Sequence, residues 1–330
     1  MLRKGYSTVG RPKSGSVMKP FHILLAVLVA VIWGVAFVVS KIGLESFTPS
    51  QLTSLRFMVA GIAAVWLPRP RIRWSSIIAV GLTVFTGQFL LQFFGIALGM
   101  PAGLTAVVVQ TQALFTVLFA ALAIGDRPSA QQLAGMLTGF AGVILISSTV
   151  GGSITFLGFS LTLASAVSWA IGNVLVKQLP KVDMLHLMVW ASLVPPLPAL
   201  AISSILDGPG AIIHALTVAP LMGIAAPIYL GVFASVLAYA VWGSLLQRYS
   251  TGAVAPFALL APCVGAAMSA LVLGEHFGPL RLAGIACMLV GLAVVAIPFS
   301  AIERQTLFVR LDVIYRRIKA RLDEAHPDSP

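Results

Sequence analysis

Charged residues are scarce in this sequence of 330 residues. Asp, Glu, Lys and Arg together make up only 9% of it, whereas an average soluble domain contains about 25%. Hydrophobic residues make up 58%, and the mean hydropathy is +0.99. A soluble protein of this composition would aggregate, so the composition indicates that the solvent of this chain is the lipid bilayer.

The sequence also lacks the motifs of metal, redox and enzyme chemistry. Its two cysteines, Cys263 and Cys287, lie in separate apolar segments without C-x-x-C or zinc spacing, so we expect free buried thiols. It contains no H-E-x-x-H sequence, no Walker A motif and no pair of aspartates within an apolar segment. We therefore expect no catalytic residue, metal site, cofactor or enzyme activity, and no ATP-driven pumping by this chain alone.

Ten apolar runs are long enough, or nearly long enough, to cross a bilayer as helices. The runs are continuous rather than alternating, which excludes the strands of a membrane β-barrel. A backbone within hydrocarbon must satisfy its own hydrogen bonds, so each run should be helical. We therefore predict an all-α membrane protein with ten transmembrane helices. The runs are 21–40, 51–67, 76–98, 102–124, 131–148, 156–176, 185–205, 222–246, 252–273 and 282–299.

The formal net charge of +11 is distributed unevenly along the chain. If the ten runs are helices, 18 of the 21 Lys and Arg residues lie on one side of the membrane. This positive-inside pattern predicts that both termini are cytoplasmic. The basic residues are then a topology signal and a contact for anionic lipid headgroups, and we expect no nucleic-acid partner.

One motif, A-L-x2-G-[DE]-x6-L-A-G-x6-G, occurs twice with the same spacing. It begins at Ala121 in the first half of the chain and at Ala270 in the second half. Trp33 and Trp169 also occupy equivalent positions, each eight residues before a lysine. Two repeats of five spans cannot insert with the same orientation, so the second repeat must be inverted, which is a known architecture of secondary transporters.

The repeat divides the chain into four predicted parts. A basic cytoplasmic segment, 1–20, precedes the first five-helix repeat at 21–148. The second, inverted repeat covers 156–299, and a cytoplasmic tail follows at 300–330. Within 301–322, hydrophobic residues recur at helical spacing with arginines on other faces, which predicts a basic amphipathic helix in the headgroup region. A regulatory or partner-binding tail is the alternative.

Polar and aromatic side chains within the runs are the first candidates for function, because burying polar groups in hydrocarbon is costly. Amides, hydroxyls and indoles can hydrogen-bond a small polar solute, while aromatic rings pack against its apolar part. The alternative is that these groups hydrogen-bond one another across helices. The predicted lining of a substrate path is Trp33, Gln88, Gln92, Gln110, Gln112, Trp169, Asn173, Tyr239 and Trp242.

Three cations are candidates for a gating or charge role. Arg56 lies within the second run, and our first interpretation is a structural arginine that snorkels or binds a carbonyl, with carboxylate binding as the alternative. Lys41 and Lys177 lie at equivalent helix ends, where a cation stabilises the helix dipole or could take part in symmetry-related gating. No Asp or Glu lies within any of the ten runs, so the sequence reveals no carboxylate for ion coupling.

Over residues 21–299 the chain resembles the drug/metabolite transporter superfamily, EamA type. The doubled motif and the ten spans carry this resemblance. Within the family, the chain looks most like bacterial exporters of amino-acid metabolites, of the O-acetylserine/cysteine type. The segments that carry the closer resemblance are Trp33–Lys41, Leu55–Phe57, Gly99–Leu104, Gln110–Ala113, Leu206–Gly208, Trp242–Gly243, Arg248–Tyr249 and Val254–Pro256.

The resemblance implies a bundle of two inverted five-helix repeats around a central cavity, which works by alternating access. It implies a multi-pass secondary transporter of the bacterial inner membrane that exports small amino-acid-like metabolites, with a small-molecule substrate and the lipid bilayer as its partners. One alternative is an exporter of another small solute, such as a nucleobase, a sugar or a drug. A second is a non-transporting membrane scaffold or lipid enzyme, which would have no particular reason to contain an inverted repeat.

Overall fold

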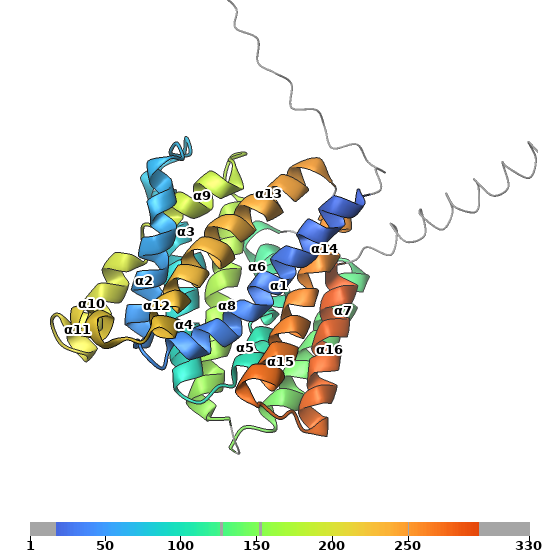
Figure 1. Cartoon of the computed structure of the whole chain (residues 1–330). Coiled ribbons are helices and arrows are strands. Elements are labelled where there is room, and N and C mark those ends of the chain that lie inside the picture. Colours follow the sequence, from blue (N-terminus) through green and yellow to red (C-terminus); the bar gives the residue numbers. More distant parts are fainter. Residues whose placement is uncertain (1–17, 126–127, 152–153, 250, 297–330) are drawn as a thin grey trace, which may run out of the picture.

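The structure, a computed structural model, describes residues 18–125, 128–151, 154–249 and 251–296. Long helices within these residues lie side by side in one bundle (Figure 1). The predicted amphipathic helix at 301–322 lies outside the described residues. The all-helical prediction is confirmed for the part of the chain that the structure describes.

The first half of the chain forms five successive stretches of helix. Trp74–Ala97 is one span made of three labelled segments, and Ala102–Ile124 is one span broken by a turn near its middle. The segments are α1 (Pro20–Gly43), α2 (Pro49–Gly61), η1 (Ile62–Val65), α3 (Trp74–Val80), η2 (Gly81–Gly87), α4 (Gln88–Ala97), α5 (Ala102–Val108), α6 (Thr111–Ile124) and α7 (Ala130–Ser147).

The second half follows the same order and adds one short helix, α11, which projects from the side of the bundle (Figure 1). Met184–Leu206 and Leu221–Arg248 are single spans built from several segments. The segments are α8 (Phe156–Lys177), α9 (Met184–Ala191), α10 (Pro196–Leu206), α11 (Ala211–Val218), α12 (Leu221–Ile228), η3 (Tyr229–Leu237), α13 (Ala238–Arg248), α14 (Thr251–Ala258), α15 (Leu260–Leu273) and α16 (Pro279–Ala296).

Nine helices among the described residues are long and apolar enough to cross a membrane. The predicted run at 51–67 is shorter, because it forms a 13-residue α-helix, α2, continued by the four-residue 3-10 helix η1. Pro68 and Pro70 follow, and proline cannot continue a regular helix. Since α2 packs along α10 and most of its residues are buried, including Ser54 and Arg56, contacts with protein shield its polar side chains from lipid.

Both copies of the repeated motif end a helix in the same way. Gly125 follows α6 with a φ of 73°, and Gly274 follows α15 with a φ of 65°. This left-handed conformation is accessible to glycine at little cost, because glycine has no Cβ. The repeated spacing within the motif therefore reflects a helix end followed by the start of the next span, α7 or α16.

The helices that follow the two motif copies, α7 and α16, pack against each other through glycines. A Cβ placed on Gly291 would lie 2.4 Å from the backbone nitrogen of Gly139 and 2.6 Å from the carbonyl oxygen of Gly135. A Cβ on Gly142 would lie 2.6 Å from the carbonyl oxygen of Gly284. The two backbones are therefore in direct contact, as small residues allow where no hydrophobic force drives helices together in lipid.

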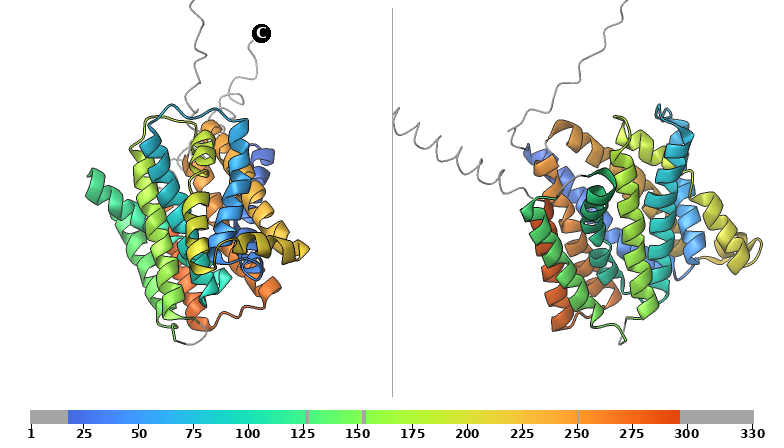
Figure 2. Two further views of the ribbon diagram at one scale, coloured as in Figure 1. Left: turned by 90° about the vertical axis from the view of Figure 1, so that its left-hand side faces the viewer. Right: turned by 180° about the vertical axis from the view of Figure 1, so that it is seen from behind.

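Helices of each half pack against helices of the other half. Helix α1 packs along α15, η3 and α13 of the second half, while α8 packs along α6, η2 and α4 of the first half. Helix α2 pairs with α10, and α7 pairs with α16. In Figures 1 and 2, α1 begins at the upper end of the bundle, whereas α8 begins at the lower end.

The third span of each half contains a π-helical segment, η2 or η3. In η2, the Thr86 hydroxyl donates to the carbonyl oxygen of Gly81 at 3.0 Å, and in η3 the Ser235 hydroxyl donates to that of Leu230 at 2.9 Å. Each hydroxyl thus reaches the carbonyl five residues before it. Gly81 and Gly231 both face the second span of the opposite half, so the two π segments occupy corresponding places in the bundle.

Replacing Gly291 by Val should lower the free energy of unfolding by about 1–3 kcal/mol or more, because its side chain would overlap the α7 backbone. Thermal stability of the detergent-purified protein, followed by size-exclusion chromatography, measures this effect. Gly278→Val is the matched control, since a Cβ there meets nothing within 4 Å. Equal melting temperatures for the two variants would contradict the tight contact between α7 and α16.

Candidate functional site

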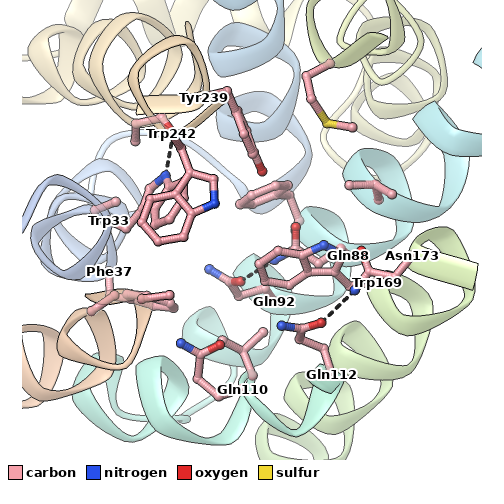
Figure 3. Close-up of a pocket in the computed structure, with 18 of the residues that line it drawn as sticks. Trp33, Phe37, Gln88, Gln92, Gln110, Gln112, Trp169, Asn173, Tyr239 and Trp242 are labelled. Carbon is pink, nitrogen blue, oxygen red and sulfur yellow. Dashed lines mark hydrogen bonds between the residues drawn. The ribbon is translucent and has the colours of Figure 1, made fainter. Parts of the chain in front are cut away.

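A cavity of about 390 Å³ lies between the two halves of the bundle. Its volume is within the range of about 300–1,000 Å³ that is typical of small-molecule sites. All of the residues predicted to line a substrate path contribute to its wall, although they come from widely separated parts of the chain (Figure 3). These residues are Trp33, Gln88, Gln92, Gln110, Gln112, Trp169, Asn173, Tyr239 and Trp242.

One side of the cavity is a cluster of aromatic rings from α1 and α13. The Trp33 ring centroid lies 5.3 Å from that of Trp242 and 5.8 Å from that of Tyr239, with tilted planes (Figure 3). The Trp33 indole N–H donates to the carbonyl oxygen of Ala234 at 3.1 Å, which fixes the orientation of its ring. This cluster offers an apolar surface whose shape is set by contacts between the halves.

The amide side chains on the opposite side form two hydrogen-bonded pairs. Gln88 Nε2 donates to Gln92 Oε1 at 2.8 Å within α4. Asn173 Nδ2 on α8 donates to Gln112 Oε1 at 2.7 Å and to Thr116 Oγ1 at 3.1 Å on α6. The amides therefore do bond one another, in part across helices. These bonds use the oxygens of Gln92 and Gln112, so their NH₂ groups remain available to a solute (Figure 3).

Gln110 differs from the other amides. It lies at the turn between α5 and α6, where the span Ala102–Ile124 is broken. Its side chain lines the cavity, and no hydrogen bond to that side chain occurs within the described part of the chain. The position of the Gln110 side chain is thus set by the backbone of this turn and not by a hydrogen-bond partner.

Arg56 of α2 also reaches the cavity wall, but not in the way that we first interpreted it. Its side chain is only 4% exposed, so it does not snorkel to the membrane surface. Within the described residues its guanidinium makes one hydrogen bond, from Nη2 to Ser235 Oγ at 3.3 Å, and none to a carbonyl. Its Cζ lies 3.8 Å from the centroid of the Phe89 ring and 5.3 Å from that of Phe57, which is cation–π geometry.

Lys41 and Lys177 lie outside the cavity wall. Each lies in the last turn of its helix, α1 or α8. A cation there interacts favourably with the negative end of the helix dipole. The two lysines thus occupy the helix ends where we expect them, and their gating role stays a prediction.

Several lining residues were not predicted from the sequence, notably Phe37, Phe89, Met184 and Met188. Phe37 is four residues after Trp33, and the two methionines are also four residues apart, so helical spacing gave a partial signal. An apolar side chain in an apolar run does not reveal whether it faces lipid or a cavity. Among the described residues, no group of three or more His, Cys, Asp and Glu side chains is placed to hold a metal ion.

A comparison with protein families finds the EamA-like transporter family twice in this chain, over residues 20–148 and 156–297. The chain is 40% identical over 276 residues to the "Probable amino-acid metabolite efflux pump" of Escherichia coli (strain K12). That match covers 82% of this chain and 92% of the relative. The protein of the same name from Salmonella typhimurium is 40% identical over 275 residues, covering 81% of this chain and 92% of the relative.

More distant similarities extend the comparison. The "Probable terminal-alkyne amino-acid exporter" of Streptantibioticus cattleyicolor is 27% identical over 280 residues, which cover 82% of this chain and 91% of that protein. Among the solved structures that match, a crystal structure aligns with a TM-score of 0.57 and 20% sequence identity, over 84% of this chain and 96% of that chain. At this level of identity, the structural match shows the fold alone.

Asn173→Ala should lower the free energy of unfolding by about 1–2 kcal/mol, because it removes two hydrogen bonds between α8 and α6. Gln110→Ala is the matched control, since it removes an amide from the same cavity without breaking such a bond. Thermal unfolding of the two purified variants separates these cases. If both variants melt at the same temperature, the α6–α8 bonds do not stabilise the bundle.

Proposed function

This chain belongs to the EamA-like transporter family, and from this premise we propose that it exports small amino-acid-like metabolites across the bacterial inner membrane. The observation that carries the proposal is the cavity between the halves, lined by amides and aromatic rings. The 40% identity to proteins named as probable amino-acid metabolite efflux pumps supports this substrate class. The chain is thus a transporter rather than an enzyme.

The chemistry of the cavity suits a small zwitterion with a modest side chain. The NH₂ groups of Gln92 and Gln112 can donate to a carboxylate, and the oxygen of Gln110 can accept from an ammonium group. The rings of Trp33 and Trp242 can pack against the apolar part of the solute. The nine residues predicted for the substrate path would then share the binding of one small molecule.

We propose that α2 with η1 completes a set of ten spans, arranged as two inverted repeats at 21–148 and 156–299. The opposite starting ends of α1 and α8 support the inversion, as does the exchange of helix contacts between the halves. The segments 1–20 and 300–330 would both be cytoplasmic, since the loops rich in Lys and Arg require that end to face the cytoplasm.

The opposite, outer end is held by carboxylates that join the two halves. Glu275 accepts hydrogen bonds from the backbone N–H groups of Ala102 at 2.7 Å and Gly103 at 3.0 Å. Asp207 Oδ2 accepts from the Thr48 hydroxyl at 2.8 Å. Alternating access would break these bonds when the cavity opens outwards, because each of them joins one repeat to the other.

The test of this function is transport in proteoliposomes with a panel of solutes, with and without an imposed pH gradient. Amino acids and cysteine-pathway metabolites should move faster than nucleobases, sugars and cationic drugs. In cells, overexpression should raise the extracellular release of the same metabolites. No transport of any amino acid in either assay would refute the proposed substrate class, and transport of one of the other solutes would identify the alternative.

Gln92→Ala should lower the rate of amino-acid transport by roughly 10-fold, because the solute loses one hydrogen bond to a desolvated amide. Expression should remain close to that of the wild type, while detergent stability should fall modestly because the buried Gln88 Nε2 loses its acceptor. Gln178→Ala, an exposed glutamine after α8 and outside the cavity, is the control. A Gln92→Ala variant that transports at full rate would remove Gln92 from the substrate path.

A further inference from the structure

The guanidinium of Arg56 is a buried charge without a carboxylate partner. Among the described residues, its Nε is the one buried side-chain nitrogen or oxygen without a hydrogen-bond partner. Its single bond goes to Ser235, whose hydroxyl hydrogen is already directed at the carbonyl oxygen of Leu230. Ser235 is therefore a neutral acceptor that orients the guanidinium without neutralising it.

Among the described residues, no carboxylate lies inside the bundle as a counter-ion for Arg56. No Asp or Glu lies within any of the ten apolar runs. The described carboxylates all lie at or just beyond helix ends: Glu45, Asp183, Asp207 and Glu275. A guanidinium remains protonated in proteins, and an uncompensated charge within a membrane-spanning bundle is costly. Charged residues that are kept inside a membrane-spanning bundle in spite of this cost are commonly functional.

The contacts of Arg56 restrict the plane of the guanidinium but leave its buried Nε–H without a hydrogen-bond partner. The Phe89 ring stacks on the group at 3.8 Å, and Phe57 lies at 5.3 Å, so the two rings restrict its rotation. The unbonded Nε–H belongs to a planar fork that matches the two oxygens of a carboxylate. Arg56 also lines the same cavity as Gln88 and Gln92, which flank Phe89 on α4.

We propose that Arg56 binds the carboxylate of the transported solute, which supplies a counter-charge that no described carboxylate provides. This inference rests on the proposed function and identifies the solute as a carboxylic acid with a single negative charge at this site. One guanidinium balances one carboxylate, whereas a phosphate dianion would leave a second charge uncompensated in the same cavity. The NH₂ groups of Gln92 and Gln112 could donate to the same carboxylate, and Gln110 and the aromatic rings would then contact the rest of the molecule.

The first test is binding to the purified protein, measured by ligand-induced thermal stabilisation with small L-amino acids, each matched with its carboxamide, in which an uncharged amide replaces the carboxylate. The wild type should bind each acid more tightly than its amide. Arg56→Met should weaken acid binding by roughly 10- to 100-fold, because a charged hydrogen-bond donor is lost, and should not weaken amide binding. Arg56→Lys should keep part of the preference, since it retains the charge without the planar fork.

The second test is the stability of the protein without ligand. Arg56→Met should raise the melting temperature of the empty protein, because it replaces an uncompensated buried charge with an apolar chain. If Arg56 had a purely structural role, Arg56→Met would lower the melting temperature. Arg69→Gln is the matched control, because Arg69 also lies over an aromatic ring, that of Trp74 at 4.8 Å, but is exposed outside the cavity.

The outcomes separate this inference from the proposed function. A wild type that binds acids and amides equally, or binds neither, overturns the role of Arg56, as does an Arg56→Met variant that still prefers acids. Transport of amino acids with the acid preference intact in Arg56→Met would refute the Arg56 site while leaving the exporter function in place. Acid-selective binding through Arg56 without any transport would refute the exporter function alone.

Discussion

The structure of this protein depends on one constraint, which is that hydrocarbon offers no hydrogen-bond partner to a polar group. The backbone meets this constraint by forming helices, and the π segments meet it through the hydroxyls of Thr86 and Ser235, which bond carbonyls five residues back. Polar side chains meet it by facing the interior, where Asn173 bonds α6 and Arg56 stacks on Phe89. The cavity is therefore a region where polar groups of several helices gather.

The constraint also explains how much of the fold could be predicted from the sequence. Long apolar runs are unambiguous, and nine of the ten form membrane-length helices. The run at 51–67 is harder, because its polar residues reflect contacts with α10 that composition cannot reveal. The sequence did not predict the π segments, because the hydropathy of an apolar run does not change when a helical turn contains one more residue.

The cavity was predictable to the extent that it is polar. Amides and indoles stand out in an apolar run, and each one that we selected lines the cavity. Phe89 and Met188 do not stand out, because their side chains would suit a lipid-facing surface equally well. The expectation that Arg56 snorkels was wrong for a related reason. Snorkelling requires a path to water, and the burial of α2 between other helices removes that path.

The paired π segments have a consequence for the history of the chain. Each adds a residue to a helical turn in the third span, and Gly81 and Gly231 each pack against the second span of the opposite half. The same irregularity at corresponding places in both halves is most simply inherited from one ancestor. On that account both halves share one altered register, in which the face that α4 or α13 presents is rotated relative to the start of its own span.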